Sequence, residues 1–234
     1  MVQVCKADIA LALTTLGSHP SGRSGAERVH SWLLEPAAAR LGHLAELAGQ
    51  AARKLGKPPP LVDLEHGEMR LCPERWGPIW SNLVHVVRTA VYHGIETPEQ
   101  REERGKPASG QIWLLAGLRG ADVVLEVRDD GRGIPSKRVA EKARARDLPH
   151  GTPEELQRAM FSDGFSTADQ GHTDISGRGV GLAAMLQACE QLGGRLEMDS
   201  SDGAGSCFRF VIPVASPDEV WTPVVHGDLE AQTG

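Results

Sequence analysis

Two glycine clusters contain the residues of this sequence that are best suited to bind a nucleotide. The first is Asp129-Asp130-Gly131-Arg132-Gly133-Ile134, which follows an apolar, strand-like run. A carboxylate followed by two spaced glycines lets the backbone turn sharply and approach a flat ligand closely. The Asp can accept a hydrogen bond from the exocyclic amine of adenine. The alternative is that these residues form only a tight β-turn.

The second cluster is Ser176-Gly177-Arg178-Gly179-Val180-Gly181, which opens a helix-like segment. Glycines before a helix N-terminus leave backbone N–H groups free to hold phosphate oxygens. Many proteins contain such a glycine loop, so this match alone is weak. No Gly-Lys-Ser/Thr follows, which excludes a Walker loop. The cluster also follows a loop rather than a strand, which disfavours a Rossmann dinucleotide site.

Strands and helices that would position these clusters alternate along residues 61–214. Strands are predicted at Leu61–His66, Gln111–Leu118, Val123–Val127, Arg195–Ser200 and Cys207–Val214, and 69–72 is expected to pair with the first of them. Helices are predicted at Pro73–Gly94, Ser136–Leu148, Pro153–Phe161 and Val180–Leu192. This alternation predicts a two-layer α/β domain with a mixed sheet.

The two ends of the chain differ from this domain. Residues 1–57 show helical spacing in two stretches separated by a loop, which predicts an N-terminal helical hairpin. Its apolar stripes need a partner, either the next domain or a second copy of the chain. Three prolines at 58–60 mark the boundary to the domain. Residues 215–234 are polar and contain two prolines, which predicts a flexible tail.

Composition disfavours several classes of partner and site. A net charge of −6, only 4% aromatic residues and no basic run argue against nucleic-acid binding. The 4 cysteines are scattered without a CxxC pair, which disfavours a zinc site or a disulfide framework and fits a reducing cytosol. No apolar stretch approaches the roughly 18 residues of a membrane span. We therefore expect a cytoplasmic protein without membrane insertion.

The order of these motifs resembles the catalytic domain of CheA-type chemotaxis histidine kinases. The helix from Leu83 to Glu96 reads LVHVVRTAVYHGIE, close to the LxHLxRNAxDHGIE of that family. DDGRGI, GFSTA at 164–168, TDISGRGVG at 173–181 and LGG at 192–194 follow in the family's order. The resemblance covers about residues 33–214 and is specific because several independent motifs agree.

This resemblance implies the GHKL (Bergerat) ATPase fold, in which ATP and Mg²⁺ bind an α/β sandwich under a lid at 161–176. The implied activity is transfer of the γ-phosphoryl group to a histidine on another domain. Asp129 would bind adenine, Gly131 and Gly133 would allow its close approach, and His85 would face the γ-phosphate. The family pattern assigns further residues to the site: Arg88 and Lys142 to catalysis, and Thr89, His93, Ile134, Arg138, Phe165, Ser166, Thr167, Ser176, Gly177, Arg178, Gly179, Val180, Gly181 and Ser206 to nucleotide binding. The alternatives are a structural role for His85 and a solvated helix face for Arg138.

The metal-binding position departs from the family pattern. The Asn that ligates magnesium in the family is Thr89 here, and the Asp three residues later is Tyr92. A Thr hydroxyl can ligate magnesium but is shorter than an amide carbonyl. We therefore expect weakened or altered magnesium dependence. The alternative to a kinase is a nucleotide-binding pseudokinase that serves as a scaffold and docks signalling partners.

The resemblance also extends to the N-terminal helices and to partners. Residues 34–57 align with the second dimerisation helix of the family, which implies a homodimer. The alternative is a helix that packs only on its own domain. The family's phosphoacceptor context, His-Ser/Thr-x-Lys-Gly, does not occur in the sequence. The implied partners are therefore a separate histidine-phosphotransfer domain and a response regulator of a two-component phosphorelay.

Overall fold

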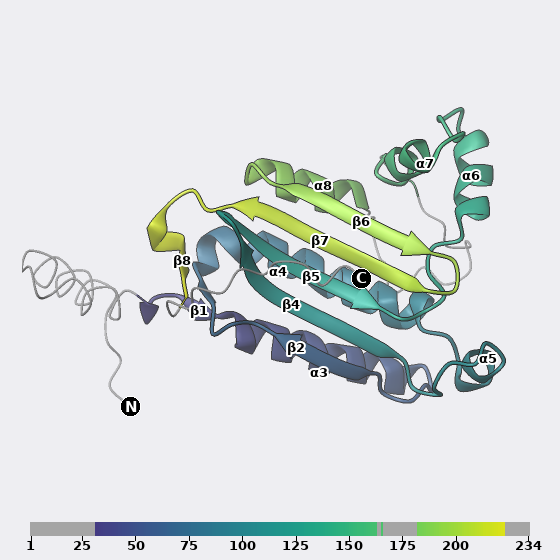
Figure 1. Ribbon diagram of the computed structural model, residues 1–234, viewed down its shortest axis with the longest axis horizontal. Helices are drawn as coiled ribbons and strands as arrows, with labels where there is room; N and C mark the ends of the chain where they lie inside the picture. Colours follow the sequence, from purple (N-terminus) through teal and green to yellow (C-terminus); the bar gives the residue numbers. More distant parts are fainter. Residues whose placement is uncertain (1–30, 163–164, 166–181, 223–234) are drawn as a thin grey trace, which may run out of the picture.

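A five-stranded mixed sheet with helices on one face forms the body of the protein (Figure 1). The computed structural model describes residues 31–162, 165 and 182–222. The strands are β2 (Leu61–Glu65), β4 (Gln111–Arg119), β5 (Asp122–Asp129), β6 (Arg195–Ser201) and β7 (Gly205–Pro213), in the order β2-β4-β5-β7-β6. β2 runs parallel to β4, and the other neighbours are antiparallel. The prediction of a two-layer α/β domain with a mixed sheet is confirmed.

Three helices cover one face of this sheet: α3 (Ala37–Lys54), α4 (Pro73–Thr89) and α8 (Leu182–Gln191) (Figure 1). Alternate residues of the strands point toward them, because side chains change face at every residue. Ile112 and Leu114 of β4 are buried in this way, as are Leu125 of β5 and Phe210 of β7. Trp76 of α4 is fully buried in the same core.

The apolar stripe of α3 belongs to this core. Leu41, Leu44 and Ala48 are all buried and lie in one hydrophobic cluster with Trp76 and Ile79 of α4. This packing agrees with the alternative that the helix serves its own domain. The first helix of the predicted hairpin lies outside the described residues, so dimerisation through 1–57 stays a prediction.

The long helix predicted at Pro73–Gly94 is confirmed, but its last turn has a different geometry. α4 ends at Thr89 and continues as a π-helical turn, η1 (Ala90–Gly94). The Ile95 N–H donates to the carbonyl of Ala90 at 2.7 Å, five residues back. Single π-helical turns are rare in proteins, and those that occur often lie at functional sites.

The prediction that 69–72 pairs with β2 is wrong. β3 (Arg70–Leu71) lies between β1 (Glu35–Pro36) and β8 (Val220–Trp221) in a separate small sheet. Residues 215–222 therefore do not form a loose tail. They form η2 (Pro217–Glu219) and β8, held by an ion pair of 3.1 Å between Arg75 and Glu219. Residues 223–234 lie outside the described residues.

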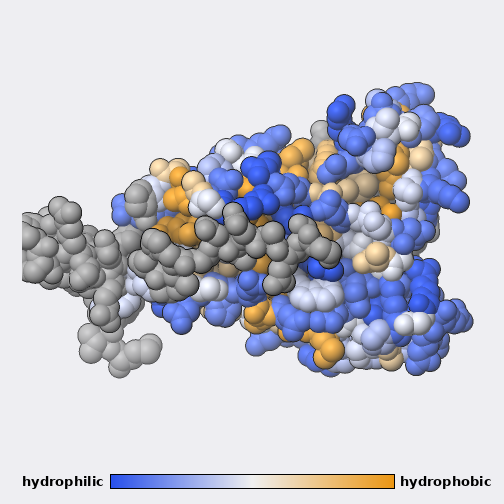
Figure 2. Space-filling view, in the orientation of Figure 1, coloured by the Kyte–Doolittle hydropathy of each residue, from blue (hydrophilic) through white to orange (hydrophobic). Residues whose placement is uncertain are grey.

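Three short helices gather at the end of the sheet where β5 terminates: α5 (Pro98–Glu102), α6 (Ser136–Arg144) and α7 (Pro153–Met160) (Figure 1). α5 and α7 each begin with a capping box, formed by Thr97 with Gln100 and by Thr152 with Glu155. In Figure 2 this end of the molecule is predominantly hydrophilic. Within residues 31–162, 165 and 182–222, the helices lack the length and apolar character needed to cross a bilayer.

Candidate functional site

Asp129 ends β5, and its carboxylate is buried, with 4% of the residue exposed. The Gly131 N–H donates to its Oδ1 at 2.9 Å, and the Ser206 N–H also donates to the carboxylate. Burial raises the pKa of Asp129 to about 6, with the neighbouring Asp130 and Glu96 adding to the rise and the two N–H donors opposing it. A poorly solvated carboxylate of this kind gains from a ligand that brings another donor, such as an amino group.

The two glycines after Asp129 are required by packing within the protein. A Cβ on Gly131 would lie 2.4 Å from the carbonyl carbon and oxygen of Gly94, at the end of η1. Gly133 has a φ of +72°, and a Cβ there would lie 2.1 Å from the carbonyl oxygen of Ser201. The loop after β5 is therefore pressed between the end of the helix and the β6–β7 turn. The predicted sharp turn is present, whereas the close approach seen here is to the protein backbone, so the approach to a flat ligand stays a prediction.

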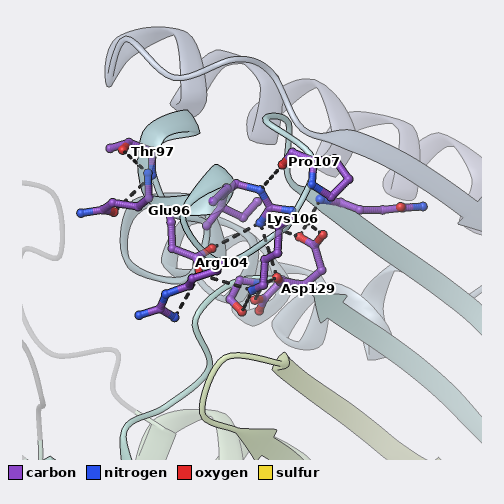
Figure 3. Close-up of polar contacts among 12 residues, drawn as sticks. Glu96, Thr97, Arg104, Lys106, Pro107 and Asp129 are labelled. Atoms are coloured by element: carbon purple, nitrogen blue, oxygen red, sulfur yellow. Dashed lines mark hydrogen bonds and ion pairs between the residues drawn. The ribbon is translucent and has the colours of Figure 1, made fainter.

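A cluster of paired charges braces this loop and consists of Glu96, Arg101, Arg104, Lys106 and Asp130. Arg101 is fully buried and donates to Glu96 Oε2 at 3.2 Å and to Asp130 Oδ2 at 2.7 Å. The Lys106 Nζ donates to the carbonyl oxygens of Asp130 and Gly131, both at 2.8 Å. Figure 3 shows Glu96 and Lys106 converging next to the Asp129 carboxylate. Below we call these five residues the Arg101 cluster.

The Arg101 cluster fixes the backbone beside Asp129, because Arg101 binds the Asp130 carboxylate and Lys106 binds the carbonyls of Asp130 and Gly131. Buried charges such as Arg101 and Glu96 are tolerated only when they are paired and hydrogen-bonded, so these contacts are costly to break. Sequence reasoning did not assign a role to these side chains. The available signal was the density of charged residues between 96 and 106, directly after the helix motif.

Four predicted site residues lie on the last turns of α4 and on η1. His85 and Arg88 are half-buried, whereas Thr89 and His93 are exposed. Within the described part of the chain, no three His, Cys, Asp or Glu side chains are grouped to hold a metal ion. Magnesium prefers oxygen ligands, and among these four residues only the Thr89 side chain offers an oxygen. These four residues fit magnesium poorly, since Tyr92 stands where the family pattern has a carboxylate.

Other predicted residues lie around α6 and the small apolar cluster next to it. Arg138 is exposed and Lys142 half-buried, both on α6. Phe165 is buried among Val139 and its neighbours in the cluster formed by α6 and α7. The structure therefore uses the Phe165 ring for packing. Ile134 is also partly buried against this cluster.

The strands β6 and β7 contribute two hydroxyls to the site. Ser206 is buried, and its Oγ lies 3.1 Å from Ser200 Oγ. Ser200 Oγ accepts a hydrogen bond of 2.8 Å from the Ile134 N–H. The structure thus brings Ser206, Asp129 and the glycine loop together, and nucleotide binding by them stays a prediction. The remaining predicted residues lie outside the described residues: Ser166, Thr167, Ser176, Gly177, Arg178, Gly179, Val180 and Gly181.

Residues 80–216 match the family model described as histidine kinase-, DNA gyrase B- and HSP90-like ATPase. The chemotaxis protein CheA of Bacillus subtilis (strain 168) is 43% identical over 142 residues, which are 58% of this chain and 21% of that protein. CheA of Listeria monocytogenes is 40% identical over 169 residues, 70% of this chain and 27% of that protein. CheA of Salmonella typhimurium is 34% identical over 206 residues, 86% of this chain and 30% of that protein.

This chain thus spans between 21% and 30% of the length of these three relatives. Among solved structures, the histidine kinase domain of the Erythrobacter litoralis EL346 blue-light activated histidine kinase matches with a TM-score of 0.48 and 17% identity. That match covers 90% of this chain and 87% of the other.

Proposed function

This chain belongs to the histidine kinase-, DNA gyrase B- and HSP90-like ATPase family, and we propose that it is the ATP-binding catalytic part of a CheA-type histidine kinase. The proposed reaction transfers the γ-phosphoryl group of ATP to a histidine on a separate histidine-phosphotransfer domain, from which a response regulator receives it. The observation that carries this proposal is the buried Asp129 carboxylate, held at the end of β5 next to glycines and the Arg101 cluster.

The adenine end of the nucleotide is proposed to bind at Asp129. The carboxylate already accepts two backbone N–H donors and has capacity for the exocyclic amine of adenine. Because the loop is pressed against Gly94 and Ser201, it cannot move away from the ligand without breaking those contacts. A rigid acceptor of this kind favours adenine, which presents an amine where guanine presents a carbonyl.

The phosphate end is proposed to lie toward α4 and α6. His85 and Arg88 on α4 and Lys142 on α6 would orient the phosphates and offset their charge. The glycine cluster at 176–181 precedes Leu182 in the sequence, and glycines before a helix leave N–H groups free for phosphate, which supports a phosphate-binding role for this cluster. Thr89 would offer Mg²⁺ only a short hydroxyl, so we expect the metal to neutralise phosphate charge less effectively here than in the family.

The alternative function, a nucleotide-binding scaffold without turnover, was motivated by Thr89 and Tyr92. The comparisons give it no support, because the matched relatives are named as chemotaxis protein CheA and the matched family as an ATPase. We therefore retain the kinase, with altered magnesium dependence as its expected departure from the family.

The deciding experiment is incubation of the chain with γ-labelled ATP and a separate histidine-phosphotransfer domain. Label on the histidine domain is the expected result, and ATP binding without any transfer would refute the kinase. The Thr89→Asn variant should bind ATP more tightly than the natural chain in the presence of magnesium. The two should bind equally in EDTA, which controls for effects on the fold. A normal magnesium dependence of the natural chain would contradict the proposed role of Thr89.

We further propose a homodimer formed through residues 1–57 and a cytoplasmic location. Trp32 supports the dimer, because it is 69% exposed and lies before β1 and α3, and the apolar stripe of α3 is already buried. The location is supported by free cysteines at 72, 189 and 207. Sedimentation of the Trp32→Ser variant tests the dimer: a monomer is expected, and an unchanged dimer would refute this role of Trp32.

A further inference from the structure

Lys57 follows the C-terminal end of α3, and the way this helix ends determines where Lys57 points. Gly56 has a φ of +66°, and its N–H donates to the carbonyl of Arg53 at 3.1 Å. The Lys57 N–H donates to the carbonyl of Ala52 at 3.0 Å. These two bonds around a left-handed glycine form a Schellman motif. Lys57 therefore leaves α3 in a fixed direction.

The side chain of Lys57 reaches the π turn that ends the α4 helix. Its Nζ donates to the carbonyl oxygen of Val91 at 3.0 Å and to that of Ile95 at 2.6 Å. Carbonyls at the end of a helix lack partners within the helix, and a cation there is also favoured by the helix dipole. One half-buried ammonium thus satisfies two carbonyls of η1 and the residue after it.

The π turn is in direct contact with the proposed adenine-binding loop. The carbonyl of Gly94 accepts a hydrogen bond of 2.9 Å from the Arg132 N–H. A Cβ on Gly94 would lie only 3.2 Å from Asp129 Oδ1. Glu96, the residue after Ile95, belongs to the Arg101 cluster, which also donates hydrogen bonds to the loop. A displacement of the Ile95 carbonyl would therefore disturb both the Gly94 contacts and the Arg101 cluster, which together hold the loop.

The charge of Lys57 also acts on this loop. Burial lowers the pKa of Lys57, the nearby Arg132 lowers it further, and Glu96 opposes the shift. Both partners flank Asp129, since Arg132 follows it in the loop and Glu96 lies in the Arg101 cluster.

We propose that Lys57 is a positioning residue for the nucleotide, through which helix α3 holds the adenine-binding loop in place. The inference rests on the proposed ATP-binding function. It adds that nucleotide affinity depends on a side chain at the end of α3, which contacts the end of η1 and not the nucleotide.

The test compares the Lys57→Met variant with the natural chain and with Lys54→Met, a control at an exposed lysine in the last turn of α3. Methionine keeps the apolar stem but removes both charge-assisted hydrogen bonds. We expect the Kd values for ATP and ADP to rise by the same factor, about tenfold, because a loss comparable to one such bond is transmitted to the loop. Lys54→Met should bind like the natural chain, and Lys57→Arg should recover most of the affinity.

The outcomes separate the inference from the proposed function. Absence of nucleotide binding by the natural chain would refute the proposed function itself. Unchanged affinity in Lys57→Met, with only a lower Tm, would overturn the inference and leave a purely structural lysine. A loss for ATP without a loss for ADP would also overturn it, because the effect would then lie at the phosphates. If Lys57→Met does not fold, Lys57→Gln is measured instead, with the same outcomes.

Discussion

Replacing Asp129 with Asn should stabilise the fold while it weakens nucleotide binding. The pKa of the Asp129 carboxyl is raised from 3.8 to about 6, mainly by burial. The folded state therefore disfavours the ionised carboxylate by about two pKa units, or on the order of 3 kcal/mol. This cost is absent below the unfolded pKa, grows as the pH rises from about 4 to about 6, and is fully present above that range. Asn resembles the protonated form and avoids it.

Urea denaturation of both proteins at two pH values measures this effect. At roughly pH 7.5 the Asp129→Asn variant should be more stable by on the order of 2–3 kcal/mol, and near pH 4 the difference should vanish. Calorimetric titration should show ATP affinity reduced by about 10–100-fold, because a charged acceptor for the adenine amine is lost. Such a gain in stability at the expense of function is common at binding sites.

The adjacent carboxylate provides a control with the opposite sign. Asp130 accepts hydrogen bonds from buried Arg101 at 2.7 Å and from the Gln111 N–H at 2.8 Å. The Asp130→Asn variant should therefore lose about 2 kcal/mol or more of stability at neutral pH. If Asp129→Asn is no more stable than the natural protein at neutral pH, the Asp129 carboxylate does not carry the proposed burial cost and the reasoning is refuted.

Three further predictions follow from the same site. ATP affinity should decrease about tenfold per pH unit below about pH 6, as Asp129 becomes protonated; a flat calorimetric profile between roughly pH 5 and 8 would contradict this. Gly131→Ala should lower the free energy of unfolding by about 3 kcal/mol in urea denaturation, because its Cβ would meet backbone at 2.4 Å. Gly203→Ala, whose Cβ would meet nothing within 4 Å, should lower it by only about 1 kcal/mol. Equal losses in the two variants would contradict the packing role of Gly131. Arg101→Met should lower the free energy of unfolding by about 3–5 kcal/mol, because it leaves Glu96 buried with weaker partners. An unchanged Tm in a thermal scan would contradict this stabilising role of Arg101.

The sequence alone determined most of the regular elements of the domain and the position of Asp129, the proposed adenine-binding carboxylate. The hairpin of β4 and β5 was predicted because two apolar, strand-like runs are joined by a short turn at 119–122, and this pattern is a local property of the sequence. Asp129 was predicted at the strand end because an Asp and spaced glycines follow an apolar run. A phosphate-binding role for the glycines at 177, 179 and 181 was also predicted from the sequence, and it stays a prediction because these residues lie outside the described part of the chain.

The supports of the site were decided only by the tertiary structure. Lys57 contacts carbonyls 34 and 38 residues away, and Arg101 contacts Asp130 from 29 residues away. β3 pairs with β8 across about 150 residues, although its own sequence suggested pairing with β2. Periodicity and local motifs describe which face a side chain takes within its own element. They contain no information on which distant backbone that side chain meets, and those distant contacts hold Asp129 in place.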